Sequence, residues 1–186
     1  ADSTLRDEMM TMLLAGHDTT ALTLTYTYYL LGKSPTVQSK LHDELDAIER
    51  PVTAADTMGL DYASNVLNEA MRIYPPVYVL FRSPTRKVEL GGYTVPEGAL
   101  LMLPQWVVHR SERYWEAPLT FDPTRWGQNE RHRFAFFPFG GGKRICIGKQ
   151  FSLLESKLIL ATVAKEYNLE LVSDTELTLR PTLTMH

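Results

Sequence analysis

The amino-acid sequence predicts a mainly α-helical fold with a small antiparallel β component, an α+β architecture. Apolar residues recur every three or four positions over several long stretches, which is the pattern of helices with one buried face. A central stretch instead alternates β-branched and aromatic residues with polar ones, and glycines and prolines separate these stretches. The 186 residues, 44% hydrophobic and 22% charged, are typical of one globular domain over residues 1–186.

Each helix is predicted from its apolar period and from a signal at one of its ends. Gly32 and Pro35 end the first apolar series, and Ser34 is a suitable N-cap for the second because Pro35 can occupy the first helical position. The pair Pro75 and Pro76 ends the third. We therefore expect helices over residues 3–31, 35–50, 60–74 and 146–167, and a short helical piece over 54–58.

The β component is expected over residues 77–103, with tight turns at Gly91 and Gly92 and at residues 96–98. Residues 105–142 are rich in Pro, Trp and Phe and are expected to form loops. Two further short strands are expected over residues 168–182, around Ser173 and Asp174.

Charge and composition exclude several classes of function. The net charge of −3 is too small to indicate a nucleic-acid partner, and a single cysteine excludes an intrachain disulfide framework. The longest apolar run, around residues 22–31, is broken by threonines and tyrosines and is too short to cross a bilayer. With no recognisable signal peptide, we expect a cytoplasmic location, although the chain begins without Met and a preceding segment could carry a membrane anchor.

Cys146, the only cysteine, lies in a loop rich in glycine and cationic residues that leads into an apolar helical stretch. A thiol at a helix start, close to Lys143 and Arg144, is stabilised as the thiolate, which is the form that binds metals. Three successive glycines and a rigid apolar run ending at Phe139 would let the backbone approach a large, flat group. The residue type alone also fits a small buried core cysteine.

This loop resembles the cysteine-ligand signature of the cytochrome P-450 haem-thiolate proteins, Phe-x-x-Gly-x-Arg-x-Cys-x-Gly. Phe139, Gly142, Arg144, Cys146 and Gly148 all stand in register with it. The resemblance implies that Cys146 is the proximal ligand of the iron of heme b (iron protoporphyrin IX) and that Arg144 pairs with a haem propionate. In this family, electron donation from the sulfur favours cleavage of bound dioxygen. The matching motifs belong to the C-terminal half of family chains, so we expect the C-terminal part of the cytochrome P-450 fold, without its N-terminal half.

The first predicted helix contains Ala-Gly-His-Asp-Thr-Thr at residues 15–20, where a glycine, an acid and two hydroxyls are poor local choices for a helix interior. Such local conflicts often mark functional sites, although a helix that merely packs against a neighbour would also accommodate them. The hexapeptide is similar to the family's oxygen-activation motif. That similarity implies that Thr19 hydrogen-bonds dioxygen and that Asp18 relays protons from solvent.

Glu69 and Arg72 are three residues apart, so they lie on one helix face and can form an ion pair. Taken alone, such a pair is common on protein surfaces and weak. The segment from Phe121 to Trp126 resembles the family's Pro-x-Arg segment, with Trp126 where Phe is usual. The resemblance implies that Arg125 joins Glu69 and Arg72 in a buried cluster that locks the cysteine loop, with an architectural role.

Four further features complete the predicted site. Arg82 and Arg110 carry planar guanidinium groups that suit carboxylates, so both are candidate propionate partners, with surface arginines as the alternative reading. Residues 77–80 are expected to line part of an apolar substrate pocket. A cationic docking face is expected around the cysteine loop, formed by Arg131, Arg133, Lys143 and Lys149.

The predicted function is therefore a monooxygenase that activates dioxygen and inserts one oxygen atom into a hydrophobic small molecule. Its electrons would come from a ferredoxin, flavodoxin or reductase partner, and no nucleic acid is expected. Two alternatives stay open: a haem-thiolate enzyme that rearranges hydroperoxides, and a non-catalytic, truncated haem-binding fragment. A phosphate-binding loop is disfavoured because no Ser or Thr follows Lys143, and a zinc site is disfavoured because the five histidines are scattered.

Overall fold

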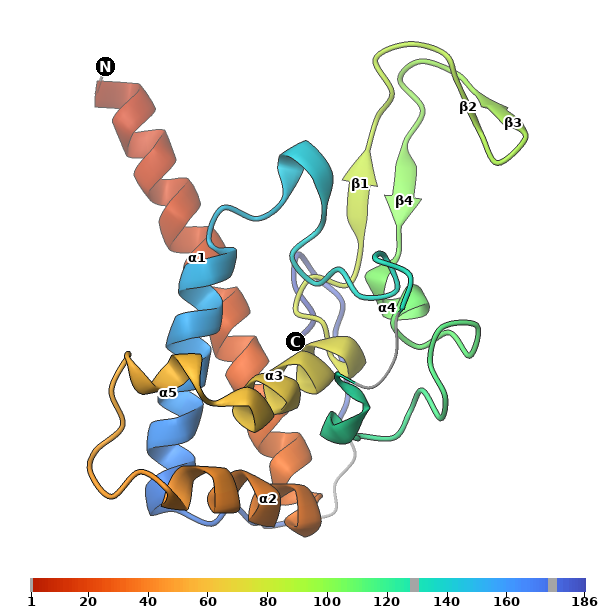
Figure 1. Cartoon of the computed structure of the whole chain (residues 1–186). Coiled ribbons are helices and arrows are strands. Elements are labelled where there is room, and N and C mark those ends of the chain that lie inside the picture. The colour runs from red at the N-terminus through yellow and green to blue at the C-terminus, as the bar shows by residue number, and fades with distance from the viewer. Residues whose placement is uncertain (1, 128–130, 174–176) are drawn as a thin grey trace.

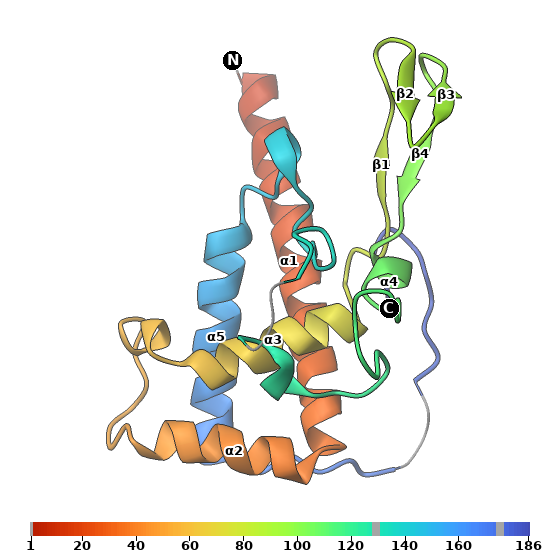
Figure 2. The ribbon, with the colours of Figure 1, turned by 45° about the vertical axis from the view of Figure 1, so that its right-hand side comes forward.

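The computed structural model describes residues 2–127, 131–173 and 177–186, and Figure 1 shows its helices gathered on one side of a slender β arm. Four longer helices form the body: α1 (Asp2–Gly32), α2 (Pro35–Asp46), α3 (Asp61–Ile73) and α5 (Lys149–Glu166). Figures 1 and 2 agree that α1 and α5 run side by side and that α2 lies across their lower ends. The mainly α prediction is confirmed for the described residues.

The hydrophobic core lies where these four helices meet. Leu31 of α1, Leu41 and Leu45 of α2, Leu67 of α3 and Leu160 of α5 are all at most 1% exposed. The apolar stripes that the sequence places on each helix therefore face one another, and their removal from water is the main term that stabilises the body.

Three helical segments differ from the predicted ranges by more than one residue at an end. The second helix ends at Asp46, and the predicted helical piece over 54–58 is only a 3₁₀ turn, η1 (Asp56–Met58). The last helix begins at Lys149 and not at Cys146, because the Cys146 amide donates to the Phe139 carbonyl at 2.9 Å. That bond holds the cysteine in the preceding turn, so the prediction of a helix start at the cysteine was wrong.

The β component consists of two short antiparallel pairs. Strand β1 (Leu80–Arg82) pairs with β4 (Leu101–Leu103), and β2 (Val88–Leu90) pairs with β3 (Tyr93–Val95). Gly91 and Gly92 both have positive φ, 57° and 85°, as a two-residue hairpin turn requires. Figure 2 shows this arm extending away from the helices, so the predicted sheet forms but packs little against the core.

The expected loop region and the expected C-terminal strands both differ from the prediction. Residues 105–142 contain a short helix, α4 (Gln105–Val108), one 3₁₀ turn, η2 (Pro123–Arg125), and the first residue of a second, η3 (Gly142–Arg144). The strands expected over 168–182 do not form within the described residues, which contain only a bridge between Pro181 and Met185. Part of that prediction, residues 174–176, lies outside the described residues.

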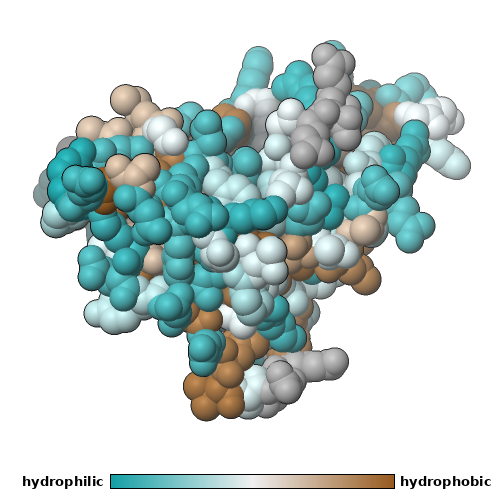
Figure 3. Space-filling model, turned by 60° about the horizontal axis from the view of Figure 1, so that its bottom comes forward, coloured by the Kyte–Doolittle hydropathy of each residue, from teal (hydrophilic) through white to brown (hydrophobic). Residues whose placement is uncertain are grey.

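The first half of α1 forms the predicted helix but has no core to pack against. Leu5, Met9, Met12 and Leu13 are each at least 60% exposed, and Figure 1 shows this end standing clear of the body. The opposite end of the molecule, where α2 lies, is covered mostly by hydrophilic residues (Figure 3). Among the described residues, none of the helices is both long and apolar enough to cross a membrane.

Candidate functional site

The loop that carries Cys146 contains two glycines with positive φ. Gly140 and Gly142 have φ of 73° and 70°, a region that residues with a Cβ adopt at a cost, and η3 then turns the chain towards Cys146. The Cys146 amide closes the loop by donating to the Phe139 carbonyl at 2.9 Å. The outcome is an exposed thiol presented three residues before the start of α5.

Two of the glycines give space to protein side chains. A Cβ on Gly141 would stand 2.7 Å from the ring of Phe134, and one on Gly140 would stand 3.2 Å from Leu80. The sequence predicts that the glycine run lets the backbone approach a large, flat group. At these two positions the backbone instead lies close to side chains of this chain. Gly142 has open space around it, and a Cβ on Gly148 would make ordinary contact with the Cys146 sulfur at 3.8 Å.

The segment around the thiol combines exposed apolar side chains with the exposed cation Arg144. Three large apolar side chains are exposed here: Ile145 by 49%, Ile147 by 90% and Phe151 by 70%. A group of exposed apolar side chains often marks a binding surface. Arg144 is exposed, and its guanidinium forms no ion pair or hydrogen bond within the described ranges. This arrangement suits a flat apolar ligand that carries an anionic edge.

The predicted oxygen-activation motif lies in the middle of α1. The Thr19 hydroxyl donates to the Ala15 carbonyl one turn earlier, at 2.8 Å, and a Cβ on Gly16 would meet nothing within 4 Å. Both residues therefore leave the helix surface open at this point. One residue further on, the hydroxyls of Thr20 and Ser152 lie 3.2 Å apart, and this contact joins α1 to the first turn of α5.

Asp18 is held by residues that the sequence did not single out. Its Oδ2 accepts a hydrogen bond from the Thr184 hydroxyl at 2.5 Å and lies 3.3 Å from Nε2 of His186. The backbone of the same segment bonds to α1 as well, because the Tyr26 hydroxyl donates to the Met185 carbonyl at 2.5 Å. No local pattern in residues 177–186 indicates this contact, since it depends on where the chain returns to α1.

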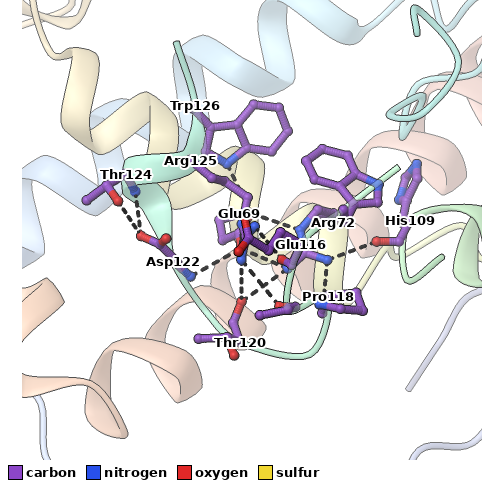
Figure 4. A network of polar contacts seen from close by, with 12 residues as sticks. Glu69, Arg72, His109, Glu116, Pro118, Thr120, Asp122, Thr124, Arg125 and Trp126 are labelled. Carbon is purple, nitrogen blue, oxygen red and sulfur yellow. Dashed lines mark hydrogen bonds and ion pairs between the residues drawn. The ribbon is translucent and has the colours of Figure 1, made fainter. Parts of the chain in front are cut away.

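Glu69, Arg72 and Arg125 come together in a buried ionic cluster (Figure 4). Glu69 and Arg72 are fully buried, and their Oε1 and Nη2 atoms are 2.8 Å apart. Arg125 Nε is also 2.8 Å from Glu69 Oε1. The resemblance had placed these three residues in one buried cluster, and the structure brings them together.

The remaining hydrogen-bonding groups of the cluster find partners mainly in the main chain around it. Arg72 donates to the carbonyls of His109, Pro118 and Thr120 at 2.9, 2.6 and 3.2 Å. Trp126 Nε1 donates to the second carboxylate oxygen of Glu69 at 3.1 Å, which gives the unusual Trp a role in the network. Buried charges cost free energy unless they are paired and hydrogen-bonded, and here every partner is present.

The other predicted arginines take different positions. Arg82 donates to the carbonyl of its neighbour Phe81 at 2.7 Å. Arg110 lies over the Trp106 ring at 3.2 Å from its centroid, and burial lowers the pKa of Arg110 to about 10. Arg131 donates to the Arg125 carbonyl and lies over Trp115, so it supports the ionic cluster and does not form part of an open cationic face.

Two buried residues of α4 and its C-cap, Gln105 and His109, were missed by the sequence analysis. Both are 0% exposed, and both contact the main chain of Phe137. The available signal was a pair of polar residues four positions apart in a stretch otherwise rich in apolar residues, and that signal alone does not specify a partner.

Comparisons with known proteins match the whole chain to one family. The family model for Cytochrome P-450 matches residues 1–185. The chain is 36% identical to the Streptomyces melanosporofaciens "Cyclooctatin synthase" over all of its residues, and 38% identical over 95% of them to "Cyclooctat-9-en-7-ol 5-monooxygenase" of the same organism. It is also 38% identical, over 90% of its residues, to "Protein LUTEIN DEFICIENT 5, chloroplastic" of Arabidopsis thaliana.

The chain covers 41%, 39% and 29% of the lengths of these three curated relatives. The family model nevertheless extends over nearly every residue, from the exposed end of α1 to the segment that returns to Asp18. The chain therefore belongs to the cytochrome P-450 family.

Proposed function

We propose that this chain forms the haem-thiolate part of a monooxygenase that inserts one atom of dioxygen into a hydrophobic small molecule. The observation that carries the proposal is the Thr20–Ser152 contact of 3.2 Å, because it joins the helix of the Asp18–Thr19 motif to the first turn of α5, the helix that follows the Cys146 loop. A haem-thiolate monooxygenase would need both parts, a thiolate to hold the iron and a proton source for dioxygen, and Cys146 and the Asp18–Thr19 motif would supply them.

The residues at the site fit heme b. The sulfur of Cys146 is accessible, the exposed apolar side chains of Ile145 and Ile147 flank it, and the guanidinium of Arg144 is open to a propionate. Bound haem supplies the one-electron and dioxygen chemistry that amino-acid side chains lack. Cys146 would bind the iron, and Arg144 would orient the macrocycle through a charge-assisted hydrogen bond.

Asp18 and Thr19 would control the proton. Thr19 has one hydroxyl proton, which it donates to Ala15, so it must release that carbonyl when it donates to dioxygen. Asp18 is partly exposed and is bonded to Thr184, so it can exchange protons with solvent while its carboxylate stays in place. Ordered proton delivery favours productive oxygen cleavage over peroxide release.

An electron donor is required, and a ferredoxin, flavodoxin or reductase is the proposed class. Lys143 and Arg133 remain candidates for its docking face because both are exposed, whereas Arg131 is engaged with the ionic cluster. An acidic donor would be attracted to such a face, and its rate of electron transfer would fall as salt rises. Salt-independent reduction would count against this part of the proposal.

The spectrum of the reduced, carbon monoxide-bound protein tests the thiolate directly. We expect a strongly red-shifted Soret band, and we expect Cys146→Ser to lose it. Turnover with reductant and dioxygen, compared with turnover on a hydroperoxide alone, separates a monooxygenase from a hydroperoxide-rearranging enzyme. A protein that binds haem but turns over under neither condition would support the non-catalytic haem-binding alternative.

Thr19→Ala tests the oxygen-activation role, with Thr25→Ala as a matched control in the same helix. Both hydroxyls donate to the carbonyl four residues earlier, at 2.8 and 2.9 Å, so both substitutions remove the same kind of bond. We expect Thr19→Ala alone to keep haem binding and raise the peroxide released per electron consumed. Unchanged coupling would refute the role of Thr19.

A further inference from the structure

Helix α4 and its C-cap hold one residue of the loop that precedes Cys146 by both of its main-chain polar groups. The Phe137 amide donates to Nε2 of His109 at 3.0 Å, and Nε2 of Gln105 donates to the Phe137 carbonyl at 2.6 Å. Gln105 and His109 are four residues apart, so they project from one face of the same turn. Both side chains are completely buried.

The contacts of Gln105 and His109 with Phe137 form part of a chain of hydrogen bonds between the ionic cluster and the Cys146 loop. On one side, Arg72 Nη1 donates to the His109 carbonyl at 2.9 Å. On the other, the Phe137 carbonyl also accepts from the Gly140 amide at 2.8 Å, and the Phe139 carbonyl accepts from the Cys146 amide at 2.9 Å. The path from Arg72 to Cys146 therefore contains no exposed link before the cysteine loop itself.

We propose that His109 and Gln105 are positioning residues for Cys146, fixing the backbone of its loop so that the sulfur meets the iron at one place and angle. The inference rests on the proposed function of Cys146 as the haem ligand. It assigns to α4 a role that the Glu69, Arg72 and Arg125 cluster cannot perform alone, because that cluster makes no bond of its own to residues 137–146 in the described structure.

The chemistry of His109 suits a permanent acceptor. Its Nε2 can accept the Phe137 amide only when the ring is neutral, with the proton on Nδ1. Burial, together with the smaller effect of the neighbouring charge of Arg72, lowers the pKa of His109 to about 3, so the ring stays neutral at physiological pH. The hold on Phe137 therefore does not vary over the pH range in which the protein would work.

The chain offers a matched control for this arrangement. Gln38 also holds both main-chain groups of one residue, since its amide donates to the Leu169 carbonyl at 3.1 Å and accepts from the Leu169 amide at 2.7 Å. Gln38 is 7% exposed and lies in α2, away from the cysteine loop. Gln38→Leu therefore removes the same type of contact without touching residues 137–146.

The experiment compares His109→Phe, Gln105→Leu and Gln38→Leu in the full chain. Amide hydrogen exchange is measured at Phe137, Gly140 and Cys146, and the carbon monoxide spectrum is recorded for each variant. We expect His109→Phe and Gln105→Leu to accelerate exchange at these amides by about tenfold, the effect of losing one buried hydrogen bond. Both should also lower the fraction of thiolate-ligated haem, and Gln38→Leu should change neither.

His109→Gln, which keeps an acceptor near the Nε2 position, should restore most of the slow exchange and thiolate ligation. Equal effects in Gln38→Leu, or normal Cys146 exchange in His109→Phe and Gln105→Leu, would overturn the proposal. If His109→Phe does not fold, Gln105→Leu decides, because it removes only the 2.6 Å bond. A wild-type protein without a thiolate spectrum would refute the function of Cys146, whereas the exchange data would still decide whether α4 positions its backbone.

Discussion

The Thr184 hydroxyl donates a hydrogen bond of 2.5 Å to Oδ2 of Asp18, which joins the last described segment of the chain to the middle of α1. Thr184 is 7% exposed, whereas the Asp18 side chain is 37% exposed. The acid of the proposed oxygen-activation motif is therefore fixed on one side and open to solvent on the other. A proton relay needs that combination of a fixed position and access to water.

Thr184→Val should weaken this attachment. The substitution removes the hydroxyl donor at similar volume, so we expect the free energy of unfolding to fall by about 1 kcal/mol, the typical value of one hydrogen bond. Urea denaturation measures the change. Thr25→Val is the control, since Thr25 is exposed and bonds only within its own helix. Equal stability of the Thr184 variant and wild type would contradict the contact.

Glu69→Gln should be far more damaging. Glu69 accepts from both Arg72 and Arg125, and its neutral replacement leaves the buried guanidinium of Arg72 and the partly buried one of Arg125 without a counter-charge. We expect a loss of about 3–5 kcal/mol in the free energy of unfolding, with failure of haem incorporation. Glu112→Gln, at an exposed position, is the control. A stable, haem-loaded Glu69→Gln protein with altered products would instead indicate a role in substrate choice.

Helix α3 is capped by a residue from another helix. Leu60, its N-cap, provides no side-chain cap, and the carboxylate of Glu44 in α2 accepts from the amides of Tyr62 and Ala63 at 2.6 and 2.9 Å. We expect Glu44→Ala to lower the free energy of unfolding by about 1–2 kcal/mol, because capping bonds and the helix dipole are both lost.

Asp43→Ala is the matched control for Glu44. Asp43 precedes it in α2, is exposed, and would lose a similar charge without uncapping α3. Thermal unfolding followed by circular dichroism compares the two variants. A loss of stability as large for Asp43→Ala as for Glu44→Ala would show that net charge, and not the cap, is responsible.

The sequence predicts those features that local spacing determines. The four long helices follow from apolar periodicity, and the Glu69–Arg72 pair follows from a three-residue spacing on one helix. Arg125 was placed with them only by resemblance to a family segment. The predicted start of α5 was wrong because the Cys146 amide donates to the Phe139 carbonyl. Helix propensity gives no information about such a contact outside the helix.

The contacts that sequence analysis missed are long-range. His109 with Phe137, Asp18 with Thr184, and Glu44 with Ala63 join residues that no period or motif relates. Each depends on how the helices pack, which decides where a polar side chain finds a main-chain or side-chain partner. Burial of an unpaired polar group is costly, so each of these hydrogen bonds offsets part of the cost of burying its polar groups.

The buried histidine should make stability depend on pH. The pKa of His109 is about 3 in the folded protein, mainly because of burial, and about 6.5 in an unfolded chain. Below pH 6.5 the unfolded state takes up a proton that folded His109 does not bind. Stability therefore falls as the pH is lowered from 6.5 towards 3, by at most about 1.4 kcal/mol for each pH unit.

His109→Gln isolates this dependence because glutamine does not titrate. We expect the difference in free energy of unfolding between wild type and His109→Gln to shrink by about 2 kcal/mol from pH 7 to pH 5. Urea denaturation at the two pH values measures it. His17→Gln, at an exposed position of α1, is the control substitution. A constant difference between wild type and His109→Gln would mean that His109 is protonated in the folded state, and the Phe137 amide could then not be bonded to its ring.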